Sequence, residues 1–340
     1  MRTLTEPAAR AKTNLDPAHW DFFAGGAGEE RTVRGNEDAF AGRRIVPRVL
    51  RGVGRRDLRT TLLGTGLSMP LLLSPTAFHL LAHPSGEVGT AGAAAAEGVV
   101  MVVSMAATQP IEQIAATGAP LWFQLYPQPD AGFERHLVER AAKAGCRALV
   151  VTADSPVFGR RERDLRNGFT DLPPGLACEN MRDAAGRRRD IAMDPTLTWS
   201  VVDRLRGLTD LPIVVKGVLH PADARIAAGR ADAILVSNHG GRQLDGAIAT
   251  LDALGPIVAA VEGRIPVLMD GGVRRGTDIL VALALGATAV GIGRPVIWAL
   301  AAGGPPGVRE LLAHLRSDLD HALALAGAKR PADLTADLIA

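Results

Sequence analysis

The segment VSNHGGRQLD (236–245) sets a histidine and an arginine three residues apart around two glycines. The imidazole of His239 can take up a proton near neutral pH, and the guanidinium fork of Arg242 can bind a carboxylate. A single histidine is more often a packed core or loop residue. Asp154 also follows an apolar run, however, and a carboxylate partner orients an imidazole and stabilises its cation. These residue types together predict proton abstraction next to a substrate carboxylate.

Eight short apolar runs indicate the elements that must position these side chains. The stretches between the runs carry apolar residues on one helical face, as at Phe133, Leu137 and Val138. Continuous rather than alternating apolar runs are typical of strands buried on both faces of a parallel sheet. The runs are PLLLSP (70–75), VVMVVS (99–104), LWFQLY (121–126), ALVVTAD (148–154), PIVVKG (212–217), AILVSN (233–238), PVLMDGG (266–272) and AVGIGRP (289–295).

A strand followed by a helix, repeated eight times, predicts an α/β fold of the (β/α)₈ TIM-barrel type. The alternative is a doubly wound open sheet. The eight units and the lack of a GxGxxG motif after the first strand favour the barrel. We expect residues 1–340 to form one domain, with the barrel at 69–326 and a C-terminal tail at 327–340.

Two segments fall outside the repeat. Residues 1–68 are expected to form an N-terminal extension that is helical around Pro17 to Gly25. Residues 159–200 form a long Arg-, Pro- and Gly-rich loop after the fourth strand, and loops of this length in compact domains commonly act as lids or binding loops. Within the barrel, Thr277 is expected to cap the helix that follows DGGVRRG (270–276).

Polar residues follow the predicted strands at the end where barrel enzymes place their chemistry. One serine or threonine at such a place is often only a turn former. A polar group after every strand is hard to explain as turn chemistry, so we expect an active site at this end of the barrel. The residues are Thr76, Ser104, Gln124, Tyr126, Thr152, Asp154, Lys216, Ser237, His239, Asp270 and Arg294.

The last two strands are followed by glycines and arginines, in DGGVRRG (270–276) and GIGRP (291–295). This is the usual phosphate site of the fold, because glycine lets backbone N–H groups approach an anion and arginine binds its oxygens. The alternative to a phosphate site is a pair of ordinary tight turns that carry surface arginines. Lys216 ends the fifth strand, where it could form a Schiff base or hold negative charge on a bound ring.

Composition sets further bounds. The net charge of +2 gives no field for nucleic acid, and the basic runs at 160–166 and 187–189 have solvated loops as their simplest interpretation. Two cysteines give neither a disulfide framework nor a thiolate metal site. The most apolar window, 91–107, contains Glu97 and Ser104 and is too polar to span a membrane. We therefore expect a cytoplasmic protein that binds no metal, no nucleic acid and no membrane.

These motifs resemble the family of FMN-dependent α-hydroxy-acid oxidases and dehydrogenases, which includes glycolate oxidase, lactate oxidase and mandelate dehydrogenase. SNHGGRQLD (237–245) and DGGVRRG are the most specific. Within the family, the likeness is strongest to members that oxidise 4-hydroxymandelate. The other matching stretches are DFFAGGAGEE (21–30), SPTAFHLLAHPSGE (74–87), FQLY (123–126), TADSPVFGRRERDLRNGF (152–169), VKG (215–217) and GIGRPV (291–296).

The resemblance implies FMN as cofactor and a role for each matching residue. His239 would be the base with Asp154 as its partner, Arg161 and Arg242 would hold the substrate carboxylate, and Tyr126 would bond the substrate. Lys216 would stabilise the reduced flavin, which favours this role over a Schiff base. The other flavin-binding residues would be Thr76, Ala77, Ser104, Gln124, Thr152 and Ser237 along the ring, Asp270 and Gly271 near the ribityl chain, and Gly272, Arg274, Gly293 and Arg294 at the phosphate.

Two departures from the family pattern concern the substrate. Phe22 stands where many members carry a carboxylate-binding tyrosine, and Ala106 stands where glycolate oxidase has tryptophan. Both changes predict a roomier, more apolar pocket, which suits a bulky or aromatic (S)-2-hydroxy acid. The 159–200 loop lacks an apolar membrane-binding insert, and Ala77 is the residue found in the oxidases, so we expect O₂ as acceptor.

The resemblance therefore implies an oxidase that converts the hydroxy acid to the 2-oxo acid with formation of H₂O₂. It also implies a homotetramer, the usual assembly of the family. Three alternatives stay open at this point. They are a dehydrogenase that uses a quinone or protein acceptor, a flavin-binding protein without turnover, and an FMN-dependent isomerase. The intact set of His239, Arg242 and Lys216 disfavours the second, and HGGRQLD together with Tyr126 disfavours the third.

Overall fold

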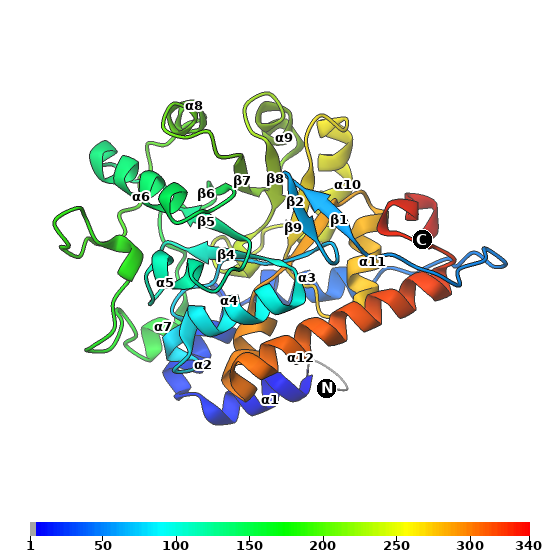
Figure 1. The fold of residues 1–340 in the computed structure, drawn as a ribbon, viewed down its shortest axis with the longest axis horizontal. Helices are drawn as coiled ribbons and strands as arrows, with labels where there is room; N and C mark the ends of the chain where they lie inside the picture. The colour runs from blue at the N-terminus through cyan, green and yellow to red at the C-terminus, as the bar shows by residue number, and fades with distance from the viewer. Residues whose placement is uncertain (1–4) are drawn as a thin grey trace.

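The computed structural model describes residues 5–340, so residues 1–4 of the predicted extension lie outside the described residues. Its centre is a closed barrel of eight parallel strands surrounded by helices (Figure 1). The strands pair in chain order, and the last pairs with the first to close the ring. The predicted (β/α)₈ barrel is confirmed. The strands are β3 (Leu71–Leu73), β4 (Val100–Ser104), β5 (Leu121–Leu125), β6 (Leu149–Thr152), β7 (Ile213–Val218), β8 (Ala233–Val236), β9 (Val267–Asp270) and β10 (Ala289–Ile292).

The strands are apolar at consecutive positions because both of their faces are buried. One set of side chains, including Val102, Trp122 and Leu235, points into the ring and forms its own cluster. The alternate positions, such as Val103 and Phe123, pack outward with the surrounding helices. Each predicted apolar run therefore contains a barrel strand.

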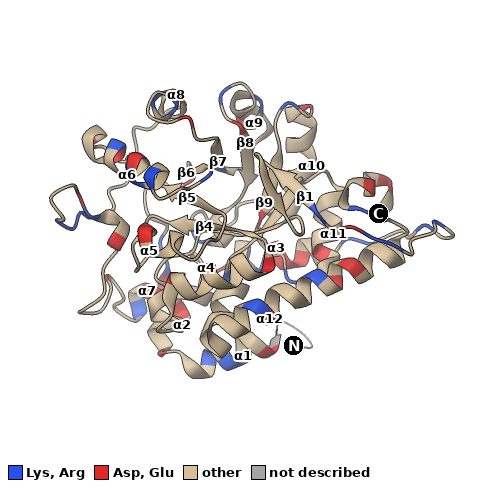
Figure 2. Cartoon of the chain, viewed as in Figure 1, with Lys and Arg blue, Asp and Glu red and all other residues tan. Residues whose placement is uncertain are grey.

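The helices surround the barrel and carry most of the charged residues, while the strands carry almost none (Figure 2). The long α12 packs against α1 and α4 (Figure 1), and it kinks at Gly303 and Gly304, directly before Pro305 and Pro306. The helices of the repeat are α4 (Gly86–Glu97), α5 (Ile111–Ala115), α6 (Ala131–Lys143), α8 (Ser200–Arg206), α9 (Pro221–Ala227), α10 (Thr250–Val261), α11 (Gly276–Ala284) and α12 (Arg294–Ala326).

The predicted cap of α11 is wrong. The helix begins at Gly276, so Thr277 lies inside its first turn. The side chain of Asp278 instead reaches back and accepts hydrogen bonds from the backbone N–H groups of Arg274 and Arg275. A carboxylate in the first turn satisfies free N–H groups at the helix start, as a capping hydroxyl would.

The N-terminal extension contains α1 (Thr5–Asn14), α2 (Pro17–Ala24) and α3 (Arg31–Ala41). The helix predicted around Pro17 is confirmed, and Asp16 caps it by accepting from the N–H of Ala18 at 2.8 Å. The extension also forms a hairpin, β1 (Thr60–Leu62) and β2 (Thr65–Leu67), which the sequence did not indicate. Leu62 and Leu67 pack with the inward-facing residues near the amino ends of the strands, so the hairpin closes that end of the barrel.

The 159–200 loop is ordered by ion pairs and contains α7 (Glu162–Arg166). Arg163 binds Asp21 at 3.1 Å and Glu30 at 2.6 Å, which ties α7 to the N-terminal extension. Arg187, Arg188 and Arg189 form surface pairs with aspartates. The solvated-loop interpretation therefore holds for 187–189, whereas the 160–166 run fastens the loop to the body of the protein.

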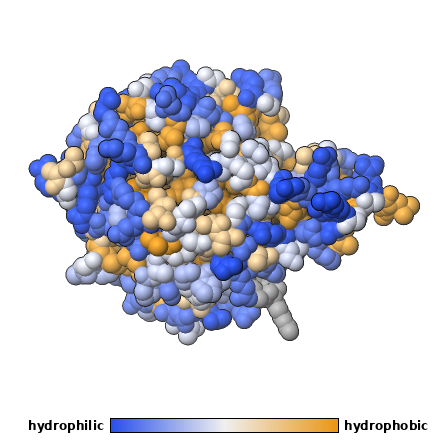
Figure 3. Space-filling view, in the orientation of Figure 1, coloured by the Kyte–Doolittle hydropathy of each residue, from blue (hydrophilic) through white to orange (hydrophobic). Residues whose placement is uncertain are grey.

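Residues 45–57 project from the body at the right edge of Figure 1. Val49 and Leu50 are largely exposed on this projection, and Figure 3 shows an apolar tip there beside hydrophilic residues. Among residues 5–340, no helix is both long enough and apolar enough to cross a membrane.

Candidate active site

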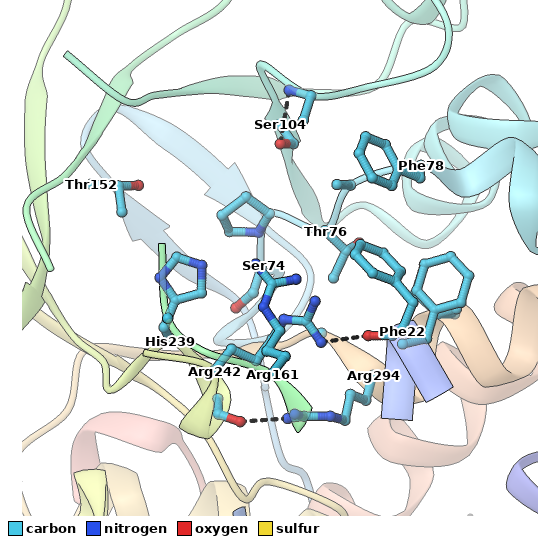
Figure 4. Close-up of a pocket in the computed structure, with 18 of the residues that line it drawn as sticks. Phe22, Ser74, Thr76, Phe78, Ser104, Thr152, Arg161, His239, Arg242 and Arg294 are labelled. Atoms are coloured by element: carbon cyan, nitrogen blue, oxygen red, sulfur yellow. Dashed lines mark hydrogen bonds between the residues drawn. The ribbon is translucent and has the colours of Figure 1, made fainter. Parts of the chain in front are cut away.

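A cavity of about 440 Å³ opens at the carboxyl ends of the barrel strands. Every strand contributes a lining residue at or just after its end, and the N-terminal extension and the 159–200 loop complete the walls (Figure 4). The predicted site residues that line it are Phe22, Thr76, Ala77, Ser104, Ala106, Gln124, Tyr126, Thr152, Arg161, Lys216, His239, Arg242, Asp270, Gly271, Gly272, Arg274, Gly293 and Arg294. The structure thus brings together residues from all parts of the chain.

Two predicted residues lie behind the cavity wall. Asp154 contacts His239 from the side away from the open space. Ser237, expected along the flavin ring, is fully buried, and its hydroxyl accepts a hydrogen bond from the N–H of His239 at 3.1 Å. Both residues therefore position His239 in this structure.

The turn after β8 carries His239 in an uncommon conformation. His239 has φ of 60°, and Gly240 and Gly241 follow with φ of 62° and 74°. Gly241 must be glycine for a second reason, because a Cβ there would lie 2.8 Å from Val33. A non-glycine residue with positive φ is strained, and such strain gathers at functional sites.

Two asparagine amides hold this turn in place. Asn36 on α3 and Asn238 exchange two hydrogen bonds of 2.9 and 2.7 Å. Asn238 also accepts from the N–H of Gly241. The N-terminal extension thus braces the segment that carries the histidine.

His239 is held between a carboxylate and a phenol. Its Nδ1 lies 2.9 Å from Oδ1 of Asp154, and its Nε2 lies 3.3 Å from the hydroxyl of Tyr126. Burial raises the pKa of Asp154, but the charges of Lys216 and His239 outweigh this and hold that pKa below its usual range. The ionised carboxylate can only accept a hydrogen bond, so Nδ1 carries the proton and Nε2 offers a lone pair.

The protonation states suit a resting base. Burial and the charge of Lys216 lower the pKa of His239 below 6.5, against the opposing charge of Asp154. Burial, followed by the charge of Asp154, raises the pKa of Tyr126. At neutral pH the cavity therefore contains a neutral imidazole that can take a proton and a phenol that can donate a hydrogen bond.

Two guanidinium groups, those of Arg161 and Arg242, lie side by side next to this base (Figure 4). Arg242 donates to the carbonyls of Phe22 and Gly25. Burial lowers the pKa of Arg242, and the charges of Arg161 and Arg294 add to the effect, yet a guanidinium stays protonated in proteins. A concentration of positive charge in a buried cavity favours an anionic ligand.

The wall beneath the arginines is aromatic. The guanidinium carbons lie over the ring of Phe22, at 4.8 Å from its centroid for Arg242 and 5.8 Å for Arg161. Phe78 stacks on Phe22 with centroids 5.2 Å apart, and Phe169 of the 159–200 loop lies at 5.1 Å. Sequence reasoning found Phe22 but missed Phe78 and Phe169, because their approach depends on how the extension and the loop fold over the barrel.

The glycine- and arginine-rich loops after β9 and β10 can hold a phosphate. Arg294 donates to backbone carbonyls of Ala24, Gly25 and Gly240, and burial together with the charge of Arg274 lowers the pKa of Arg294 to about 10. A Cβ on Gly293 would enter the cavity 3.4 Å from Thr76. Glycines leave backbone N–H groups accessible here, and arginine supplies charge for an anion.

Residues along the rest of the cavity wall fit a flavin. Lys216 Nζ and Asp270 Oδ1 are buried and, over residues 5–340, have no hydrogen-bond partner, so each needs one from a ligand. A ring carbonyl suits the lysine and a sugar-alcohol hydroxyl suits the aspartate. Gln124 links the hydroxyls of Ser104 and Thr152 by bonds of 3.0 and 3.1 Å, which makes a polar edge on the same wall. The donor and acceptor set therefore matches FMN.

The structure is a closed parallel barrel with a neutral histidine and a glycine–arginine anion site at its carboxyl end. It also holds a buried lysine that makes no hydrogen bond within residues 5–340. These features define an α/β-barrel enzyme that binds a phosphorylated cofactor. Residues 11–340 match the model of a family described as FMN-dependent dehydrogenase. The chain belongs to this family, and FMN is its cofactor. The prediction of a flavoenzyme of the hydroxy-acid oxidase family is confirmed.

The comparisons also give named relatives along nearly the whole chain. An L-lactate oxidase of Nostoc sp. is 47% identical over 95% of this chain and 94% of the relative. Glycolate oxidase 5 of Oryza sativa subsp. japonica is 44% identical over 98% and 94%. A solved structure of mandelate oxidase with (S)-2-phenylpropionate superposes with a TM-score of 0.93 at 42% identity, over 98% of this chain and 97% of the other.

The cavity floor provides a test of cofactor fit. A Cβ on Gly291 would lie 2.3 Å from Ser74 Oγ, which bonds Asp270 at 3.0 Å. We expect Gly291→Ala to disturb this pair and weaken FMN binding by about 0.5–1.5 kcal/mol, the usual contribution of one hydrogen bond, or about 2- to 12-fold in Kd. Titration of apoprotein with FMN, followed by flavin fluorescence, measures this.

The matched control is Gly255→Ala on α10, where a Cβ meets nothing within 4 Å. Its Kd for FMN should equal that of the wild type. Equal affinity for FMN in both variants would show that the floor at Gly291 does not hold the cofactor.

Proposed function

We propose that this FMN-dependent hydroxy-acid oxidase converts a bulky or aromatic (S)-2-hydroxy acid and O₂ to the 2-oxo acid and H₂O₂. The observation that carries the proposal is the position of His239 Nε2, which faces the cavity between Tyr126 and the two guanidinium groups. A base beside a carboxylate-binding pair is what oxidation at the carbon next to that carboxylate requires. We also propose that residues 1–340 act as one catalytic domain.

Each side chain has a defined part in this reaction. Arg161 and Arg242 bind the substrate carboxylate, and Tyr126 donates a hydrogen bond to the substrate. His239 Nε2 takes a proton, either from Cα or from the hydroxyl group. Bound FMN supplies the acceptor for two electrons. Asp154 stabilises the imidazolium that forms on His239. Its carboxylate also lies 3.8 Å from Lys216 Nζ, so it offsets the repulsion between the imidazolium and the lysine.

The aromatic wall supports a bulky substrate. Phe22, Phe78 and Phe169 form a continuous apolar surface, and the small side chain of Ala106 leaves space beside it. Burying a phenyl group here removes apolar area from water. The mandelate oxidase neighbours include structures with benzoyl-formic acid and (S)-2-phenylpropionate, which carry such a group. The relatives named lactate oxidase and glycolate oxidase argue against a bulky substrate, because lactate and glycolate are small acids.

The remaining sequence predictions stay predictions. O₂ as acceptor has the support of the relatives' names, all of them oxidases. A homotetramer rests on the family resemblance alone; the exposed Val49 and Leu50 offer a small apolar surface for a contact between subunits. A cytoplasmic location rests on the sequence alone.

The substrate and acceptor can be tested together. Anaerobic bleaching of bound FMN should be faster, per unit concentration, with mandelate or 4-hydroxymandelate than with glycolate or lactate, because only the aryl acids cover the phenylalanine wall. On admission of air, peroxide should form in proportion to the acid consumed. Faster bleaching by glycolate would show that the phenylalanine wall does not select aryl substrates. Bleaching without peroxide formation would point to a quinone or protein acceptor.

Replacement of the base tests the mechanism. His239→Gln should retain FMN and its yellow colour, since the cofactor contacts remain, but should lose about 10²–10⁴-fold in turnover, the usual contribution of a general base. Single-turnover flavin reduction measures the loss. A near-normal rate of flavin reduction in this variant would show that His239 is not the base.

The pH dependence follows from the lowered pKa of His239. The base works only when neutral, and the neutral form predominates above its pKa, so kcat/KM should rise with pH and its acid limb should lie below pH 6.5. Asp154→Asn removes the charge that raises this pKa, so the limb should move to still lower pH while the plateau falls. A limb above pH 6.5 in the wild type would contradict this protonation state.

A further inference from the structure

The arginine pair already has a carboxylate neighbour that belongs to the chain itself. Asp164 on α7 lines the cavity, and its Oδ2 lies 3.2 Å from Nη1 of Arg161. Both side chains are largely buried, at 14% and 19% exposed. The sequence interpretation did not single out Asp164, and the function proposed above gives it no role.

The negative charge of Asp164 acts on both arginines. It bonds Arg161 directly, and its charge partly offsets the lowering of the pKa of Arg242 by burial. The other two carboxylates along the cavity are engaged elsewhere. Asp171 pairs with Arg188 on the exposed side of the loop, and Asp270 bonds Ser74 at the floor. Asp164 is therefore the one lining carboxylate beside the Arg161–Arg242 pair, and the pair keeps net positive charge for the carboxylate of a ligand.

Asp164 is held in position because α7 is bound to the N-terminal extension. Arg163, the residue before it, binds Asp21 and Glu30 of the N-terminal extension. Asn167, one turn later, donates to Asp21 at 2.9 Å. Leu165 and Phe169 of the same segment line the cavity, so the segment presents a fixed carboxylate among apolar side chains on the substrate side of the arginines.

We propose that Asp164 is a specificity-determining residue that restricts the site to acids with one carboxylate. This inference rests on the proposed function, because it concerns the side chain of the same 2-hydroxy acid. The first carboxylate of a dicarboxylic acid meets the arginine pair, and the second meets Asp164 in a partly buried space. Like charges that face each other in such a space repel strongly, and discrimination often depends on a repulsive element of this kind.

The test measures binding of unreactive product analogues, so it does not depend on turnover. Holoenzyme with oxidised FMN is titrated with phenyl-substituted 2-oxo acid (benzoylformate) and with 2-oxoglutarate, and the change in flavin absorbance gives each Kd. In the wild type the monocarboxylate should bind more tightly. In Asp164→Asn the ratio of the two affinities should shift toward 2-oxoglutarate by about tenfold or more, because the amide keeps the shape and removes the charge.

The matched control is Asp203→Asn. It makes the same Asp-to-Asn change at an exposed residue of α8 that pairs with Arg230, and neither Asp203 nor Arg230 lines the cavity, so it should leave the ratio unchanged. An unchanged ratio in Asp164→Asn, or equal weakening of both ligands, would overturn the inference and identify Asp164 as a brace for Arg161. If the wild type binds neither ligand, the proposed function itself fails.

Discussion

The site depends on one shared carboxylate. Asp154 contacts Nδ1 of His239 through one oxygen and lies 3.8 Å from Nζ of Lys216 through the other. A buried lysine without an anion nearby would lose its proton or destabilise the fold. Asp154 keeps both cationic groups possible within one cavity. It orients the imidazole, fixes its tautomer and lies beside the lysine that would face the flavin ring, so His239 and Lys216 depend on the same buried carboxylate.

The second constraint is that the barrel does not build this site alone. The N-terminal extension supplies Phe22 as a platform for two guanidinium groups and Asn36 as a brace for the histidine turn. The 159–200 loop supplies Arg161, Phe169 and Asp164, and Arg163 joins the two segments. The barrel thus supplies His239 and the glycine–arginine loops, while two segments outside the repeat supply the aromatic wall and Arg161. In the proposed function, this division separates the oxidation itself from the choice of acid.

Sequence reasoning succeeded where local pattern and chemistry coincide. Continuous apolar runs located all eight strands, because a strand buried on both faces cannot carry polar residues at alternate positions. Residues after those runs lined the cavity, because parallel strands deliver their carboxyl ends to one rim. It failed where a partner distant in the chain decided the outcome. Thr277 lost its predicted capping role to Asp278, the β1–β2 hairpin depended on the open end of the barrel, and Ser237 lay behind the histidine it was expected to accompany.

The sequence by itself determined the barrel, the family and the set of charged residues at the site. Those properties follow from residue types and short spacings, which survive any rearrangement of loops. Only the tertiary structure decided which side chains meet. It placed Phe78 and Phe169 against Phe22, turned Ser237 away from the cavity, and set Asp164 beside Arg161. These contacts join segments that are far apart in the chain, and their geometry is set by the packing of α2, α3 and α7 over the barrel mouth, which no local pattern encodes.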